Sequence, residues 1–385
     1  MNNFPPRLAY PKKEVMPIIE EVFDFYNKQG LDPGYQGEFE KRYTDKLVDF
    51  MGSSGYADAV SSGTAAVYVA LKSLELTSDS IVLVSPVTDP GTINAIILAG
   101  LIPKLVDSKK NSYNTSLQEI KHRYDDDCKA LVVVHIGGII TEDMNQIKSF
   151  CDANDLFLVE DCAQSHGAIN ADGFKAGSFG DISVFSTMYR KNHSTGGCGG
   201  VVYTKDFEKY KLIRAYADRG KPFFDDNFDE KNPSSFMFPA LNFNLDEISC
   251  ALGIYSLSKL EEINYKRRVF IEKLSVKLNK NNYICKIVDI KKGDTPFFWT
   301  FEFIESFDYS MRDKFFSYLS KNGIPINENY SYVACEWDYA KKYFYDEFQT
   351  NNAIKYKNST FNILFNENFE YENIDFISKI INSFE

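Results

Sequence analysis

The chain has 385 residues, of which 44% are hydrophobic and 25% charged, and these are the proportions of a globular protein with a sizeable core. They exclude intrinsic disorder and fibrous repeats. The 43 Lys and Arg residues against 54 Asp and Glu residues give a net charge of −11, which excludes a general attraction for nucleic acid or anionic lipid.

Short β-rich runs alternate with helix-like stretches between about residues 60 and 210. This alternation predicts an α/β fold with a mainly parallel sheet that is covered by helices. Apolar residues at helical spacing predict helices at 65–74, 92–99 and 144–154. Strands are predicted at 81–86, 102–107, 130–135, 156–161, 182–186 and 199–204.

The pattern changes after Gly200. A polar, acidic, Pro-containing stretch at 219–239 predicts a surface loop or lid, and a long helical pattern follows it at 246–274. We predict a large domain at 1–255 and a small C-terminal α+β domain at 256–385. The small domain is expected to hold strands at 284–290 and 297–304 and helices at 311–323 and 376–384.

Three features place an anion site, a carboxylate and a lysine near one another. Gly63 and Thr64 stand where a small-residue turn enters a helix, and backbone N–H groups at a helix N-terminus bind anions. Asp161 ends a predicted strand, and Lys191 follows the next strand, so both are expected to face the crevice at the carboxyl ends of the sheet. This combination is what pyridoxal 5′-phosphate chemistry requires.

Several segments resemble motifs of the DegT/DnrJ/EryC1/StrS family of aminotransferases, which act mainly on keto sugars attached to nucleotides. The resemblance covers nearly the whole chain and implies the fold of the fold-type I pyridoxal phosphate enzymes. It is carried by SSGTAA at 61–66, VEDCAQSHGA at 159–168 and VFSTMYRKNHSTGGCGG at 184–200.

The resemblance implies a role for each matching residue. Lys191 would bond covalently to the cofactor and move the proton during catalysis, Asp161 would pair with the pyridine nitrogen, and Gln164 would contact the ring face or its 3′-oxygen. Ser186 would bind the phosphate together with Gly63 and Thr64.

Two further positions complete the expected cofactor site. Asp89 stands where the family normally has an aromatic residue that stacks on the ring. Asn242 matches an Asn that reaches the cofactor phosphate of the neighbouring subunit, which implies a homodimer with composite sites.

The implied activity is transfer of an amino group, with L-glutamate as the donor, to a nucleotide-linked keto sugar, giving an amino sugar for surface polysaccharide or a related glycan. One alternative is a sugar dehydratase or other lyase on the same scaffold. The resemblance argues against it, because the family's dehydratases have His at the position of Lys191. The other is a non-catalytic sensor or scaffold, supported by the departures from the family pattern at Asp89, Cys198 and Asn244.

Other kinds of site and location are not favoured. The seven cysteines are scattered without a CxxC pair, so we predict no disulfide framework, no metal site and a reducing, cytoplasmic setting. His135, which ends a predicted strand, is expected to be packed and hydrogen-bonded. No apolar run approaches the roughly 20 residues that span a bilayer, so no membrane association is expected.

Overall fold

A sheet of seven strands forms the centre of the protein in the computed structural model, which describes residues 4–52, 54–278, 284–328 and 330–384. The strand order is β1-β7-β6-β5-β4-β2-β3. Strands β2 to β6 are parallel, while β7 is antiparallel to both of its neighbours, which confirms the mainly parallel sheet. The strands are β1 (Tyr56–Val60), β2 (Ile81–Val84), β3 (Ile102–Leu105), β4 (Cys128–Val134), β5 (Phe157–Asp161), β6 (Ile182–Ser186) and β7 (Gly200–Thr204).

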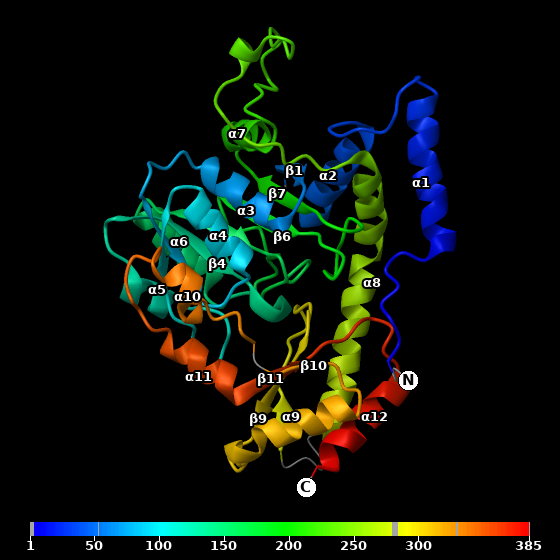
Figure 1. Ribbon diagram of the computed structural model, residues 1–385, viewed down its shortest axis with the longest axis vertical. Helices are drawn as coiled ribbons and strands as arrows, with labels where there is room; N and C mark the ends of the chain where they lie inside the picture. Colours follow the sequence, from blue (N-terminus) through cyan, green and yellow to red (C-terminus); the bar gives the residue numbers. More distant parts are fainter. Residues whose placement is uncertain (1–3, 53, 279–283, 329, 385) are drawn as a thin grey trace.

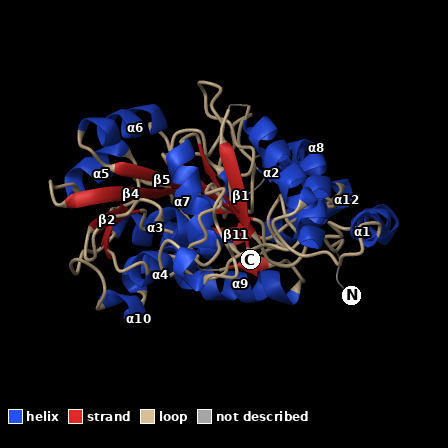
Figure 2. Cartoon of the chain, turned by 90° about the horizontal axis from the view of Figure 1, so that it is seen from above, coloured by secondary structure: helices blue, strands red, loops and turns tan. Residues whose placement is uncertain are grey.

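The sheet is buried on both faces, which explains why its strands are continuous apolar runs. Along β4, Ala130 and Val132 face one core while Leu131 and Val133 face the other. Helices α3, α4 and α7 lie on one side of the sheet, and α5 and α6 lie on the other (Figure 2). Their bounds are α3 (Gly63–Lys72), α4 (Pro90–Leu98), α5 (Leu117–Arg123), α6 (Met144–Ala153) and α7 (Phe207–Ala217).

Strand β1 is absent from the sequence prediction, and a buried polar residue explains this. Asp58 interrupts the apolar run and is only 2% exposed. Its carboxylate forms an ion pair with Arg214 on α7 at 3.1 Å. The strand therefore contains a buried charged residue, which in a sequence pattern argues against a buried strand.

Helix α8 (Glu247–Leu278) joins the large sheet to a second, smaller core (Figure 1). Its first half contributes Cys250 and Leu260 to the core on one face of the large sheet. Its second half contributes Phe270 and Leu274 to the small core. The predicted long helix is therefore present, and it continues to Leu278.

The small core is built on a second sheet with the order β10-β11-β9-β8, in which every described pairing is antiparallel. Segment 330–356 nevertheless packs against the large sheet, where Val333 and Ala353 are fully buried. The division at 255/256 therefore stays a prediction. The elements are β8 (Cys285–Ile287), β9 (Trp299–Phe303), α9 (Arg312–Lys321), β10 (Ile326–Asn327), α10 (Asp338–Lys341), α11 (Asn351–Ser359), β11 (Thr360–Ile363) and α12 (Tyr371–Asn382).

Two helices precede the sheet, α1 (Lys12–Asn27) and α2 (Glu38–Met51), and both contact α8. The segment 219–239 projects beyond α7 with only a short 3-10 turn at Pro233–Ser235, in agreement with the predicted surface loop (Figure 1). Among the described helices, none is both long and apolar enough to cross a membrane.

A glycine after β4 sets the position of the C-terminal segment. Gly138 has φ +85°, and a Cβ at this position would lie 1.9 Å from the carbonyl oxygen of Thr295. The Thr295 N–H donates to the Gly138 carbonyl at 2.9 Å, and the Phe297 N–H donates to the Gly137 carbonyl at 3.0 Å. This close contact holds segment 295–297 against the carboxyl end of β4.

We expect Gly138→Ala to lower the free energy of unfolding by about 2–5 kcal/mol, because it combines a left-handed backbone with a backbone clash. Gly30→Ala is the matched control: Gly30 has φ +70° and nothing within 4 Å of an added Cβ. It should cost only the about 1–2 kcal/mol of the left-handed conformation. Urea denaturation of both variants measures the difference, and equal losses would contradict the close-approach argument.

Candidate active site

A cavity of about 220 Å³ lies where β5 and β6 end and helices α3 and α4 begin. This is the edge at which parallel α/β sheets bind ligands. Most of the predicted cofactor residues line the cavity, namely Gly63, Thr64, Asp89, Asp161, Ser186 and Lys191.

The N-terminus of α3 forms one wall and offers free donors. Ser62 caps the helix by accepting a hydrogen bond from the Ala65 N–H at 3.0 Å. In the described part of the chain, the N–H groups of Gly63 and Thr64 and the hydroxyls of Thr64 and Ser186 have no hydrogen-bond partner. These groups, which we call the α3 cradle, therefore remain available to an anion.

Glycines bring these donors together. A Cβ on Gly63 would lie 2.6 Å from Cβ of Ser186, so only glycine lets the helix end approach the end of β6. A Cβ on Gly91, in the first turn of α4, would lie 2.3 Å from Oγ1 of Thr64. A side chain at either position would therefore force these cradle groups to shift.

Asp89 lines the cavity as the N-cap of α4. Its Oδ1 accepts a hydrogen bond from the Gly91 N–H at 2.9 Å, and Pro90 follows at the first helical position. Asp followed by Pro is a favoured way to begin a helix. The helix start explains the acidic residue, and contact with the cofactor ring stays a prediction.

Asp161 is 4% exposed at the end of β5. One carboxylate oxygen accepts from Thr92 Oγ1 at 2.8 Å, and the other accepts from the Ala163 N–H at 3.0 Å. Burial raises the pKa of Asp161, while these hydrogen bonds and the charge of Lys191 oppose the rise. The carboxylate is thus oriented by two donors and faces the cavity.

Lys191 lies in the connection between β6 and β7, residues 187–199, which we call the Lys191 loop. The side chain is 9% exposed, and its Nζ lies 4.8 Å from the centre of the Phe297 ring. None of the described carboxylates forms an ion pair with it. Burial lowers the pKa of Lys191, while Asp161 and Asp89 oppose this, so the amine gives up its proton more readily than an exposed lysine.

The donor set fits pyridoxal 5′-phosphate at three points. The α3 cradle offers N–H and hydroxyl groups for a phosphate, buried Asp161 offers a carboxylate for a protonated ring nitrogen, and Lys191 offers an unpaired amine for the aldehyde. All three groups line one cavity.

The two other predicted residues lie outside the cavity lining. Gln164 accepts from the Gly137 N–H at 2.8 Å and donates to the Tyr330 hydroxyl at 2.9 Å. Asn242 is exposed, and its side-chain oxygen accepts from Asn244. The adjacent Phe243 carbonyl accepts from the Ser61 N–H at 2.7 Å, which places Asn242 beside the cradle. Both predicted roles stay predictions.

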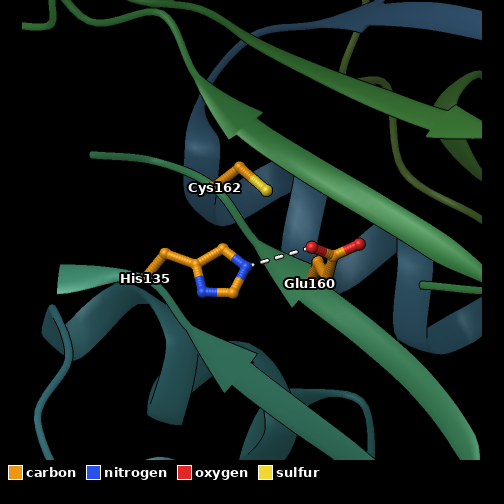
Figure 3. Close-up of side chains that lie close together, drawn as sticks. All are labelled: His135, Glu160 and Cys162. Carbon is orange, nitrogen blue, oxygen red and sulfur yellow. Dashed lines mark hydrogen bonds and ion pairs between the residues drawn. The ribbon is translucent and has the colours of Figure 1, made fainter. Parts of the chain in front are cut away.

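His135, Glu160 and Cys162 form a buried cluster of groups that can ligate metals (Figure 3). The oxygens of Glu160 already accept hydrogen bonds from His135 and from the N–H groups of Gly177, Phe179 and Gly180, all at 3.0 Å or less. The other His135 nitrogen contacts Thr141. The expectation that His135 is packed and hydrogen-bonded is confirmed, and the cluster orders the loop after β5.

Sequence reasoning missed Thr92 and Phe297. Thr92 lies three residues after Asp89, but its link to Asp161 joins residues 69 positions apart. Phe297 comes from the C-terminal part of the chain and reaches Lys191 only through the fold. No local pattern reveals either contact.

The family model of the DegT/DnrJ/EryC1/StrS aminotransferases matches residues 19–382. The chain belongs to this family. The family comprises pyridoxal-phosphate-dependent sugar aminotransferases. The family resemblance, the fold class, the enzyme class and the cofactor that the sequence predicts are therefore confirmed.

Two curated relatives and one solved structure are similar to this chain over most of its length. GDP-perosamine synthase of Vibrio cholerae is 28% identical over 269 residues, which cover 67% of this chain and 69% of the relative. UDP-4-amino-4,6-dideoxy-N-acetyl-β-L-altrosamine transaminase of Campylobacter jejuni is 26% identical over 348 residues, 89% of this chain and 88% of the relative. A structure of GDP-4-keto-6-deoxymannose-3-dehydratase with trapped PLP and glutamate has a TM-score of 0.86 at 23% identity, covering 98% of this chain and 100% of that chain.

We expect Thr92→Val to weaken pyridoxal phosphate binding by about tenfold at neutral pH, because a hydrogen bond to a charged group contributes about 1.5–3 kcal/mol. Loss of this donor raises the pKa of Asp161 further, so the loss of affinity on acidification should begin at a higher pH than in the wild type. Equilibrium titration with the cofactor across pH measures both effects.

Thr88→Val is the matched control for this substitution. Thr88 is fully buried, and its hydroxyl has no hydrogen-bond partner in the described chain. Its replacement should leave the affinity and its pH dependence unchanged. Equal effects of the two variants would contradict the role assigned to Thr92.

Proposed function

We propose that this enzyme transfers an amino group from L-glutamate to a nucleotide-linked keto sugar, with Lys191 and Asp161 as its catalytic residues. The observation that carries the proposal is the unpaired, buried amine of Lys191 in the same cavity as Asp161 and the α3 cradle. Pyridoxal phosphate, when bound, supplies an electron sink for carbanion chemistry.

In this proposal each set of residues at the cavity has one task. The N–H groups of Gly63 and Thr64, with the Ser186 hydroxyl, hold the phosphate and so fix the cofactor in the crevice. Asp161 holds a proton on the ring nitrogen, and Thr92 keeps that carboxylate oriented. Asp89, which lines the cavity, and Gln164, which lies outside its lining, are also proposed to contact the ring.

Lys191 has two proposed tasks, covalent attachment of the cofactor and proton transfer. Once the donor's amino group has displaced Lys191 from the cofactor aldehyde carbon, C4′, the freed amine would take a proton from Cα of the donor and deliver it to C4′. The same movement in reverse would serve the keto sugar. A neutral amine is needed, and the burial that lowers the pKa of Lys191 supports this role.

The choice of substrates is supported by the relatives. The names of the Vibrio cholerae and Campylobacter jejuni relatives contain a GDP-sugar and a UDP-sugar, and the similar dehydratase structure contains a trapped PLP-glutamate geminal diamine. We propose glutamate and a nucleotide sugar for this chain by the same reasoning, with the amino sugar destined for a surface glycan.

We further propose a homodimer in which Asn242 contacts the partner's cofactor phosphate. Its exposure beside the cradle supports this, because an exposed amide there is open to a second subunit. None of the seven cysteines, all of which lie in the described part of the chain, forms a disulfide, and this supports a reducing, cytoplasmic setting.

Lys191→Arg should abolish amine transfer, because a guanidinium stays protonated and cannot bond to the aldehyde. The wild type should show a cofactor absorbance band that bleaches with L-glutamate, and borohydride reduction should attach the cofactor to the peptide that contains Lys191. Lys175→Arg is the matched control: the pKa of Lys175 is also lowered by burial, but the residue lies outside the cavity. Near-normal turnover by the Lys191 variant would refute the mechanism.

Glutamate labelled with ¹⁵N on its amino group should pass that nitrogen to the sugar product. Incubation with 4-keto and 3-keto nucleotide sugars, followed by mass spectrometry, measures the transfer. A deoxygenated product without label would instead identify a dehydratase. Cofactor binding without reaction with any amino donor would identify a non-catalytic protein.

A further inference from the structure

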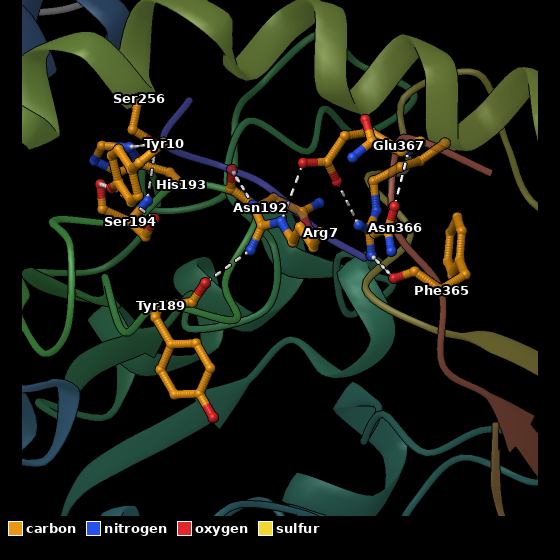
Figure 4. Close-up of polar contacts among 12 residues, drawn as sticks. Arg7, Tyr10, Tyr189, Asn192, His193, Ser194, Ser256, Phe365, Asn366 and Glu367 are labelled. Carbon is orange, nitrogen blue, oxygen red and sulfur yellow. Dashed lines mark hydrogen bonds and ion pairs between the residues drawn. The ribbon is translucent and has the colours of Figure 1, made fainter. Parts of the chain in front are cut away.

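The residues before α1 cross the Lys191 loop. We call residues 4–10 the N-terminal strap. One end is held on the small core, where the Phe4 and Phe369 rings stack at 5.0 Å. Beyond the other end, α1 is held on α8 by the Tyr255 hydroxyl, which donates to Glu14 at 2.6 Å. The strap therefore runs between two fixed points, with the Lys191 loop beside it (Figure 4).

Arg7 contacts the loop on both sides of Lys191. Its guanidinium donates to the Tyr189 carbonyl at 2.9 Å and to the Asn192 carbonyl at 3.4 Å. It also pairs with Glu367 at 3.0 Å, and Figure 4 shows Arg7 between the loop and this carboxylate. The side chains of Arg7 and Glu367 are 15% and 9% exposed, so water screens the pair little.

Tyr10 holds the far side of the same loop. Its hydroxyl donates to the Ser194 carbonyl at 2.6 Å and accepts from the Gly196 N–H at 3.0 Å. The Ser194 N–H in turn donates to Ser256 on α8 at 3.0 Å. The backbone on either side of Lys191 is thus hydrogen-bonded to groups that lie outside the loop.

The same network reaches the ring beside the Lys191 amine. Glu367 also pairs with Arg267 on α8 at 3.1 Å. Arg267, which is 2% exposed, donates to the carbonyls of Pro296 and Phe297 at 2.8 Å each. Phe297 is the residue whose ring lies 4.8 Å from the Lys191 Nζ. One carboxylate therefore links the loop that carries Lys191 to the segment that covers its amine.

We propose that Arg7 and Tyr10 are positioning residues, which hold the Lys191 loop so that the amine projects to the reacting carbon. The proposal rests on the catalytic role of Lys191 put forward above. A small displacement of a catalytic group lowers the rate of the chemical step while leaving ground-state binding largely intact. Substitutions in the strap should therefore lower the rate at saturating amino donor more than they change the half-saturating donor concentration.

The test uses the full-length enzyme loaded with pyridoxal phosphate and compares Arg7→Ala, Arg7→Lys and Tyr10→Phe with the wild type. Arg7→Ala should slow cofactor bleaching by saturating L-glutamate by about 10- to 100-fold. The half-saturating glutamate concentration should stay within about twofold. Arg7→Lys should recover only part of the rate, because an ammonium cannot hold two carbonyls and a carboxylate in one plane.

Lys13→Ala is the matched control. Lys13 is exposed and lies next to the strap, and its substitution removes one positive charge, as Arg7→Ala does. It should behave as the wild type. Amide hydrogen exchange of the peptide over 188–197 should accelerate in Arg7→Ala and Tyr10→Phe, while exchange in α8 stays unchanged. Tyr10→Phe keeps the test available if Arg7→Ala does not fold.

Two outcomes overturn the proposal. One is wild-type loop exchange and wild-type bleaching in folded Arg7→Ala or Tyr10→Phe. The other is faster exchange throughout the protein with no change in rate at saturating glutamate, which means a purely structural role. Borohydride labelling of the wild type distinguishes failure of the proposed function from failure of the positioning role of the strap. Label elsewhere than Lys191 refutes the proposed function, while hydrogen exchange still reports whether the strap holds the loop.

Discussion

The structure depends on keeping a lysine amine buried near a carboxylate without pairing the two. Burying an amine and a carboxylate costs free energy, and a direct ion pair is the usual compensation. Here Asp161 is stabilised by Thr92 and a backbone N–H, and the Lys191 amine lies over the Phe297 ring. Each group is therefore oriented by partners other than its counterion, which leaves both open to a ligand between them.

The surrounding architecture serves that arrangement. The parallel strands end at one edge and deliver Asp161 and Ser186 to the same cavity. Gly63 lets the α3 N-terminus approach closely, and Gly138 lets the segment with Phe297 lie across the end of β4. Parts of the chain more than 200 residues apart thus meet at one site because small residues remove steric barriers.

Much of this was predictable from sequence, and the exceptions have physical causes. Continuous apolar runs predicted β2 to β7, and local motifs placed Asp161, Lys191 and the cradle in one crevice. β1 was missed because Asp58 is buried in an ion pair with a distant helix. Thr92 and Phe297 act through contacts that span the fold, and Gln164 is engaged by Tyr330 from the C-terminal segment. Periodicity and motifs describe neighbours along the chain, so such partners lie beyond their reach.

Helix α8 has a consequence for how the molecule comes apart. Its 32 residues span about 48 Å as one continuous helix, and its two halves belong to different cores. If either core melted, half of the helix would lose the packing that sustains it, and helices of that length are marginal in water by themselves. The two cores are therefore thermodynamically coupled. Although each core has its own sheet, heat or denaturant should unfold both in one cooperative transition.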